Sequence, residues 1–76
     1  MLVWFAVINT KPNEEHSVYN ALCKMEEVEY VYPLFGEWDI IVKITGESTE
    51  ELEKIMTTKI RPLNGILAIK TLTGIH

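Results

Sequence analysis

The sequence predicts an α+β sandwich in which a four-stranded antiparallel sheet carries two helices on one face. Apolar residues first follow a strand pattern, then a helix pattern, then two strands, a second helix and a last strand. Each helical segment places its apolar residues in one stripe, so each helix should pack that stripe against a face of the sheet. Two such strand–helix–strand halves form a ferredoxin-like sandwich.

The chain has 76 residues, which predicts a single domain, 1–76, too small to bury a large core by itself. It is 47% hydrophobic and has one cysteine, so disulfides do not compensate and oligomerisation is expected. The net charge is −4 and the basic residues are scattered, which argues against a nucleic-acid surface. No apolar run approaches the roughly 20 residues that span a bilayer. We therefore expect a soluble, cytoplasmic protein with no direct nucleic-acid or membrane contact.

The first strand is expected over residues 2–8, which are apolar on both alternating faces, as in a strand that is covered above and below. A helix should follow, beginning with Pro12 as its first residue or with Asn13 as its N-cap. Glu14 and Glu15 then fall in the first turn, where the helix dipole favours anions. The apolar stripe of this helix consists of Val18, Ala21, Leu22 and Met25.

A β-hairpin is predicted next, with strands over residues 28–35 and 40–44. Gly36 and Glu37 would form a two-residue type II′ turn, because glycine takes the required positive φ without strain. Asp39 begins the second strand. Its carboxylate can accept hydrogen bonds from N–H groups near the turn, or it can hold the amino group of a ligand, and turn chemistry favours the first role.

His16 and Cys23 are the reactive residue types of the first helix. Seven residues apart, they would share roughly one face, which suits a metal ligand pair or a thiolate–imidazole pair. However, no other cysteine or histidine lies near them in sequence. We therefore expect a solvated histidine and a packed thiol, with no metal and no cofactor.

The second helix should begin at Ser48, because Glu51 three residues later completes a capping box. Pro62 ends this helix, and a turn over residues 63–66 leads into a last strand over residues 66–73. The apolar stripe of the helix is Leu52, Ile55, Met56 and Ile60. Its basic residues are expected on the solvated side: Lys54, Lys59 and Arg61.

Several strands of this sheet carry apolar residues on both sides, yet both helices lie on one side. The other face would therefore be exposed in a monomer, and an exposed apolar patch usually marks an interface.

The whole chain resembles the effector-binding C-terminal domain of the Lrp/AsnC family of feast/famine transcription regulators. The shared features are the element order, a Gly-x-x-Asp motif formed by Gly36 and Asp39, the β-branched run over residues 40–44, the turn at 63–66, and Thr71 with Thr73 in the last strand. No helix-turn-helix domain is expected in these residues.

The resemblance implies that the sheets pair into homodimers, that dimers assemble into octameric or decameric rings, and that amino acids or similar effectors bind between dimers. It also implies that Gly36 and Asp39 hold the polar end of the ligand. Phe35 and Trp38 would then be apolar walls, and Thr71 and Thr73 would add hydroxyl groups. Phe35 is more apolar than the family pattern at this place. A regulatory effect would require a partner, such as a full-length Lrp/AsnC-type regulator.

Two other classes of function share this topology. Dimeric α/β-barrel enzymes of the oxygenase or isomerase type need an acid–base group inside a cavity, and His16, at a helix start, is badly placed for that role. RNA-binding modules need sheet aromatics within a basic surface. Trp4, Tyr30 and Tyr32 supply aromatics, but the acidic balance counts against this class. The sequence therefore favours a non-catalytic effector-binding and oligomerisation module.

Overall fold

The computed structural model describes residues 1–72. The elements along the chain are β1 (Leu2–Thr10), α1 (Glu15–Cys23), β2 (Val28–Pro33), β3 (Ile40–Gly46), α2 (Thr49–Ile55), the π-helical turn η1 (Met56–Ile60) and β4 (Ile66–Leu72). No helix in this part of the chain is long and apolar enough to cross a membrane.

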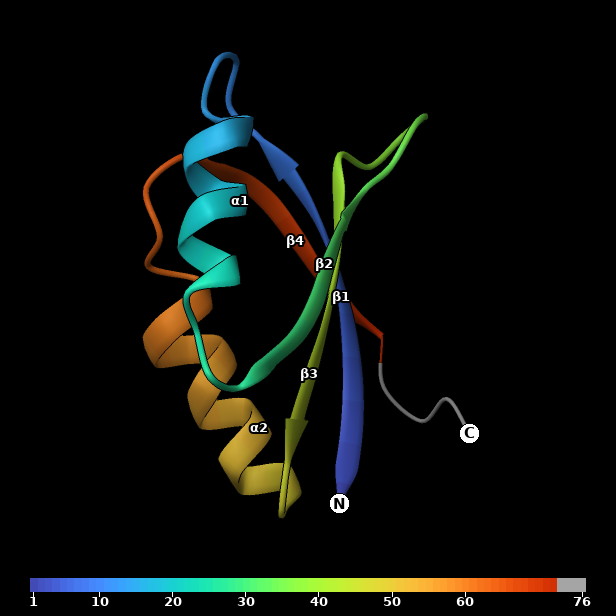
Figure 1. Cartoon of the computed structure of the whole chain (residues 1–76), viewed down its shortest axis with the longest axis vertical. Coiled ribbons are helices and arrows are strands. Elements are labelled where there is room, and N and C mark those ends of the chain that lie inside the picture. The colour runs from blue at the N-terminus through green and yellow to red at the C-terminus, as the bar shows by residue number, and fades with distance from the viewer. Residues whose placement is uncertain (73–76) are drawn as a thin grey trace.

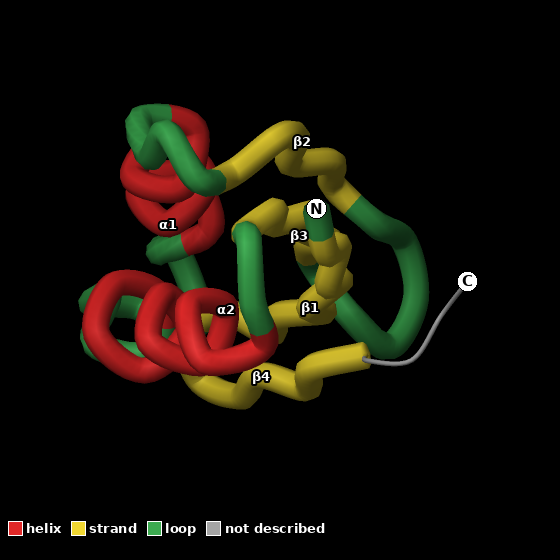
Figure 2. Tube along the Cα trace, turned by 90° about the horizontal axis from the view of Figure 1, so that it is seen from below, coloured by secondary structure: helices red, strands yellow, loops and turns green. Residues whose placement is uncertain are grey.

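The four strands form one antiparallel sheet in the order β2-β3-β1-β4. Both helices lie on the same face of this sheet, which Figure 1 shows from the side and Figure 2 along the layers. The fold is therefore the predicted ferredoxin-like α+β sandwich. β1 and β3 are the central strands, so the chain places its most apolar segments in the middle of the sheet.

The core lies between the sheet and the helices. On β1, Ala6 and Ile8 point towards the helices and are completely buried, and Trp4 packs at the edge of the same core. The predicted apolar stripe of the second helix is buried throughout. The other buried core residues are Val18, Leu22, Val31, Ile40, Val42 and Ile44.

The opposite face of the sheet has no helix over it (Figure 2). Phe5 lies 6.3 Å from Tyr30 between ring centroids, and Tyr30 lies 4.7 Å from Tyr32. Tyr32 is 57% exposed. The Lys43 ammonium lies 5.6 Å above the Tyr30 ring, a distance at which a cation is attracted to the ring face. We call this surface the open face. An exposed apolar face opposite the helices was predicted, because several strands carry apolar residues on both sides.

The start of α1 differs from the prediction. Glu14 is the N-cap, so the helix begins at Glu15 rather than at Pro12 or Asn13. Asn13 has a φ of +68°, a left-handed conformation that cannot be a helical N-cap but suits a turn, and asparagine tolerates it better than most residues.

The second helical segment begins as predicted and then departs from a regular α-helix. The Ser48 hydroxyl accepts a hydrogen bond from the Glu51 N–H at 3.1 Å, which is half of a capping box. The Glu51 carboxylate accepts from the Glu47 N–H instead of from the Ser48 N–H. Beyond Ile55 the segment continues as η1, a π-helical turn that was not predicted, and the Arg61 N–H donates to the Met56 carbonyl at 2.8 Å.

The turn before β4 depends on Gly65, whose φ is +96°. A Cβ atom at this position would lie 2.8 Å from the Cβ of Glu14 and 3.0 Å from Cγ2 of Val18. The Gly65 carbonyl also accepts a hydrogen bond from the Lys11 N–H at 2.7 Å. Glycine therefore lets this turn pack directly against the start of α1.

Candidate ligand-binding site

The loop between β2 and β3 projects from one end of the sheet (Figure 1). The hairpin is confirmed, but its connection spans residues 34–39, because the Leu34 N–H donates to the Asp39 carbonyl at 2.8 Å. The predicted two-residue turn at Gly36 and Glu37 is therefore wrong. Gly36 nevertheless has a φ of +109°, so the loop does need a residue without a side chain there.

The base of this loop is tied to β1. The Asp39 N–H donates to the Ile8 carbonyl at 3.0 Å. Oδ2 of Asp39 accepts from the Thr10 N–H at 2.9 Å and from the Thr10 hydroxyl at 3.3 Å. Asp39 is thus used to join two strand ends, which explains why β3 begins only at Ile40 and why the connection is longer than two residues.

The side chains of the loop differ in exposure. Phe35 is fully exposed, whereas Trp38 and Asp39 are partly buried. The exposed Phe35 ring is available for contact with a ligand or a neighbouring subunit. The loop therefore combines an exposed aromatic group, a glycine backbone and a carboxylate.

Thr71 does not join this loop within one chain. It pairs with Ala6 on β1, whereas Asp39 lies beside Ile8 and Thr10, nearer the end of the sheet from which the loop projects. Thr71 instead faces the helices and lines a separate hollow. Thr73, the other threonine of the predicted site, lies outside the described residues.

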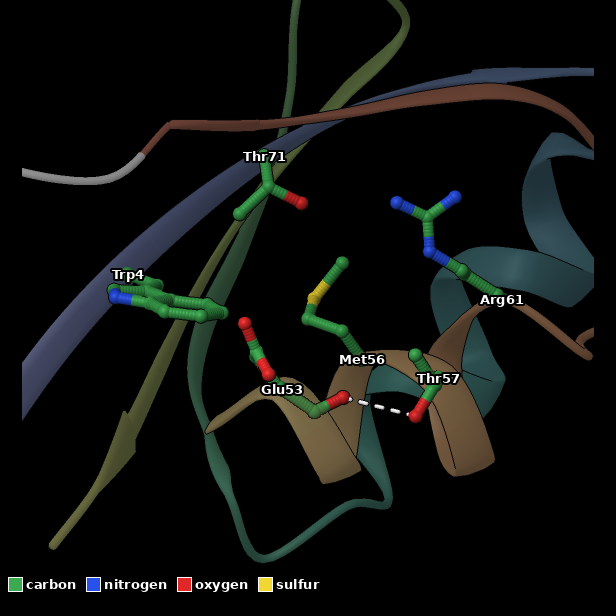
Figure 3. A pocket seen from close by; sticks show the side chains of 6 residues that line it. All are labelled: Trp4, Glu53, Met56, Thr57, Arg61 and Thr71. Atoms are coloured by element: carbon green, nitrogen blue, oxygen red, sulfur yellow. Dashed lines mark hydrogen bonds between the residues drawn. The ribbon is translucent and has the colours of Figure 1, made fainter. Parts of the chain in front are cut away.

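This hollow lies between α2, η1 and the sheet and has a volume of about 310 Å³. Met56 forms its buried floor and is 3% exposed. Figure 3 shows the Met56 side chain between Glu53, which lies near Trp4, and Arg61, which lies on the side of Thr71. The lining residues are Trp4, Glu53, Met56, Thr57, Arg61 and Thr71. We call this the α2 hollow.

Sequence reasoning assigned only Thr71 of these residues to a binding site. Glu53 and Arg61 look like ordinary solvated charges on a helix, and Trp4 and Met56 look like core residues. The π-helical turn η1 brings Met56 and Arg61 to this hollow, and its residues continue the apolar spacing of an ordinary α-helix, so nothing in the sequence signals it.

His16 and Cys23 form no site. Both are exposed, and residues 1–72 contain no group of three or more metal-ligating side chains. His16 lines a second hollow of about 300 Å³ with Glu15, Tyr19, Pro33 and Ile40. The solvated histidine was predicted correctly. The packed thiol was not, because Cys23 is the last residue of α1 and its side chain points away from the buried stripe.

Two ion pairs shape the charge distribution around the sheet. Lys59 on η1 pairs with Glu27, and this hydrogen bond lowers the pKa of the Glu27 carboxyl below its usual range. Lys43 on the open face pairs with Glu29 at 2.8 Å, which raises the pKa of Lys43. Within the described chain, Glu53 and Arg61 have no such partner.

The chain is a small α+β domain with βαββαβ order, one uncovered sheet face and a Gly-x-x-Asp loop. Domains of this class form the ligand-binding part of transcription regulators. Residues 3–75 match the model of the Lrp/AsnC ligand binding domain. The chain belongs to this family.

The relatives include longer regulators. The uncharacterized HTH-type transcriptional regulator PF0250 of Pyrococcus furiosus is 31% identical over 65 residues, which is 82% of this chain and 43% of that protein. The chain therefore spans less than half the length of this curated relative.

Solved structures agree on the fold. The crystal structure of FFRP-DM1 superposes with a TM-score of 0.93 at 32% identity, covering 99% of this chain and 100% of that chain. The transcriptional regulator NMB0573 of Neisseria meningitidis, solved as a complex with L-Met, superposes with a TM-score of 0.87, covering 99% of this chain and 50% of that chain. At 13% identity, this second likeness concerns the fold alone.

Proposed function

We propose that this domain is a non-catalytic module that binds an amino acid or a similar small effector and assembles through its sheet. The observation that carries the proposal is the family match over residues 3–75, which includes both the open face and the β2–β3 loop. Its relatives include HTH-type transcriptional regulators, which supports the proposal that this chain acts in the cytoplasm.

The open face is the proposed dimer contact. Phe5, Tyr30 and Tyr32 form an aromatic row on it, and aromatic side chains contribute most to interfaces of this kind. Pairing two such sheets gives the arrangement of dimeric α/β barrels. We further propose that dimers assemble into rings, with an octamer or a decamer as the expected sizes.

The proposed effector site is the β2–β3 loop where two dimers meet. Gly36 leaves the backbone accessible, and Asp39 supplies a negative charge for an ammonium group. Phe35 and Trp38 provide apolar walls, in keeping with pockets that are mainly apolar with few polar anchors. Thr71 is remote from this loop in its own chain and lines the α2 hollow, so its hydroxyl is not part of this proposed site, and Thr73 remains the threonine predicted for it.

An effect on transcription would run through a chain that carries an HTH domain. We propose mixed assembly with a full-length Lrp/AsnC-type regulator, since the matched relatives are HTH-type regulators with a domain of the same fold.

The test is native mass spectrometry with isothermal titration calorimetry against the twenty protein amino acids. At least one should bind, and Asp39→Asn should weaken it at least tenfold, because asparagine can still accept from Thr10 but carries no charge. Phe35→Ala, a change at an exposed side chain away from the open face, should weaken binding and leave the sheet-to-sheet dimer intact. A monomer in native mass spectra, or no binding by any amino acid, would contradict the proposal.

A further inference from the structure

We propose that the α2 hollow is a second small-molecule site, separate from the β2–β3 loop, that holds a zwitterionic amino acid with an apolar side chain. The hollow lies within one chain, so it requires no neighbouring subunit. Its volume of about 310 Å³ lies at the small end of the range of ligand pockets, which suits a molecule of this size.

The charges of the hollow define the chemistry of the ligand. Glu53 and Arg61 have opposite charges and line the same space, yet in residues 1–72 they form no ion pair with each other or with another residue. They are eight positions apart, which separates their Cα atoms by about 12 Å along a helix. A molecule with a carboxylate and an ammonium group can contact Arg61 with the first and Glu53 with the second.

The remaining lining residues suit the rest of such a molecule. Met56 is a flexible apolar floor and Trp4 a flat apolar wall, which together accept an aliphatic or aromatic side chain. The Thr71 hydroxyl points to the side where Arg61 lies (Figure 3), so it can add a hydrogen bond to a carboxylate held there.

The π-helical turn η1 is what brings these groups together. In an α-helix, residues five positions apart point roughly 140° away from each other. In a π-helix, with about 4.4 residues per turn, the difference falls to roughly 50°. Met56 and Arg61 are the two ends of such an i→i+5 hydrogen bond at 2.8 Å, so both side chains reach the same hollow. Turns of this kind occur frequently at functional sites.

The chain contains two tryptophans, one at each proposed site, which makes the two sites separable by fluorescence. Trp38→Phe leaves Trp4 in the α2 hollow as the only reporter, and Trp4→Phe leaves Trp38 in the loop. L-methionine, L-leucine and L-phenylalanine are the probes, each also as its N-acetyl and its carboxamide derivative. We expect at least one free amino acid to change Trp4 fluorescence, and we expect both derivatives to bind at least tenfold more weakly.

Charge variants then assign each end of the ligand. Arg61→Gln should weaken the free amino acid about tenfold or more and abolish its advantage over the carboxamide. Glu53→Gln should also weaken binding of the free amino acid about tenfold or more, and it should abolish the advantage of the free amino acid over the N-acetyl derivative. Lys54→Gln is the matched control, because Lys54 is exposed on the same helix but does not line the α2 hollow, and it should leave the affinity unchanged.

The outcomes separate this inference from the proposed loop site. If amino acids bind and change only Trp38 fluorescence, or if Arg61→Gln and Glu53→Gln bind them as tightly as the wild type, the α2 hollow is wrong and the loop site stands. If the amino acid changes Trp4 fluorescence and the loop variants Asp39→Asn and Phe35→Ala bind it as tightly as the wild type, the ligand site is the α2 hollow and the proposed loop site is wrong. If none of these three amino acids binds, the proposal for the α2 hollow is overturned, whereas the loop site is overturned only if none of the twenty amino acids binds.

Discussion

One carboxylate oxygen of Asp39 accepts two hydrogen bonds from Thr10, one from the backbone N–H at 2.9 Å and one from the hydroxyl at 3.3 Å. The two residues are 29 positions apart, so this contact joins the end of β1 to the start of β3. Oδ1 of Asp39 forms no hydrogen bond within residues 1–72. Asp39 therefore has a structural role, which occupies only one of its two carboxylate oxygens in the described residues.

Replacing Asp39 should destabilise the protein even without a ligand. Asp39→Ala removes the charged acceptor of both hydrogen bonds, and we expect a loss of about 1–2 kcal/mol in the free energy of unfolding. Thr10→Val removes the hydroxyl but keeps the N–H donor, so it should cost less than Asp39→Ala. Urea denaturation followed by circular dichroism measures both. Equal stability of Asp39→Ala and the wild type would show that Asp39 does not hold the loop.

A charge on the open face should separate the proposed dimer. Phe5→Asp places a carboxylate in the middle of the aromatic row, and burying it against a partner sheet without a counter-charge would cost several kcal/mol. We expect a folded monomer by native mass spectrometry and sedimentation. Trp4→Asp should lower the melting temperature instead, because Trp4 packs on the helix side of the sheet.

The control for this experiment is Asn20→Asp, which adds the same charge at an exposed position of α1. It should retain both the mass and the melting temperature of the wild type. If Phe5→Asp also retained the wild-type mass, the sheet-to-sheet dimer would be wrong.

The order of elements and the core could be predicted from sequence because they depend on periodicity. The stripe Leu52, Ile55, Met56 and Ile60 repeats at helical spacing and is buried throughout, and Ser48 caps the helix as its hydroxyl predicts. The uncovered face could also be predicted, because several strands carry apolar residues on both sides while both helices lie on one side.

The candidate site was harder to predict from the sequence, because it depends on contacts between residues far apart in the chain. The length of the β2–β3 loop is set by the bonds of Asp39 to β1, which a local turn rule does not include. The α2 hollow depends on a π-helical turn whose residues continue an ordinary helical pattern. Cys23 looks like a core residue, but it lies at the exposed end of α1.

Stability at low pH should depend on the ion pair between Glu27 and Lys59. Because the pKa of Glu27 is lowered in the folded state, its contribution is fully present above the unfolded-state pKa and is lost as the pH falls through the lowered value. Glu27→Gln should therefore reduce stability near neutral pH, by about 1 kcal/mol at most for a pair at the surface.

The measurement is the free energy of unfolding between about pH 7 and pH 3, the range in which carboxyl groups titrate. The difference between wild type and Glu27→Gln should shrink towards acid pH. Glu26→Gln is the control, since it removes a neighbouring exposed carboxylate that has no ion pair in the described chain. A difference that stayed constant with pH would refute the role of the pair.

Two glycines with similar φ values should respond differently to alanine, because their surroundings differ. Gly36 has a φ of +109° and no atom within 4 Å of an added Cβ, so Gly36→Ala should cost only the backbone strain, about 1 kcal/mol. Gly65 has a φ of +96°, and an added Cβ would also lie 2.8 Å from the Cβ of Glu14. Gly65→Ala must therefore push the turn away from α1, and we expect a loss of about 3 kcal/mol in urea denaturation. Equal losses for both variants would mean that the contact with α1 adds nothing to the backbone strain.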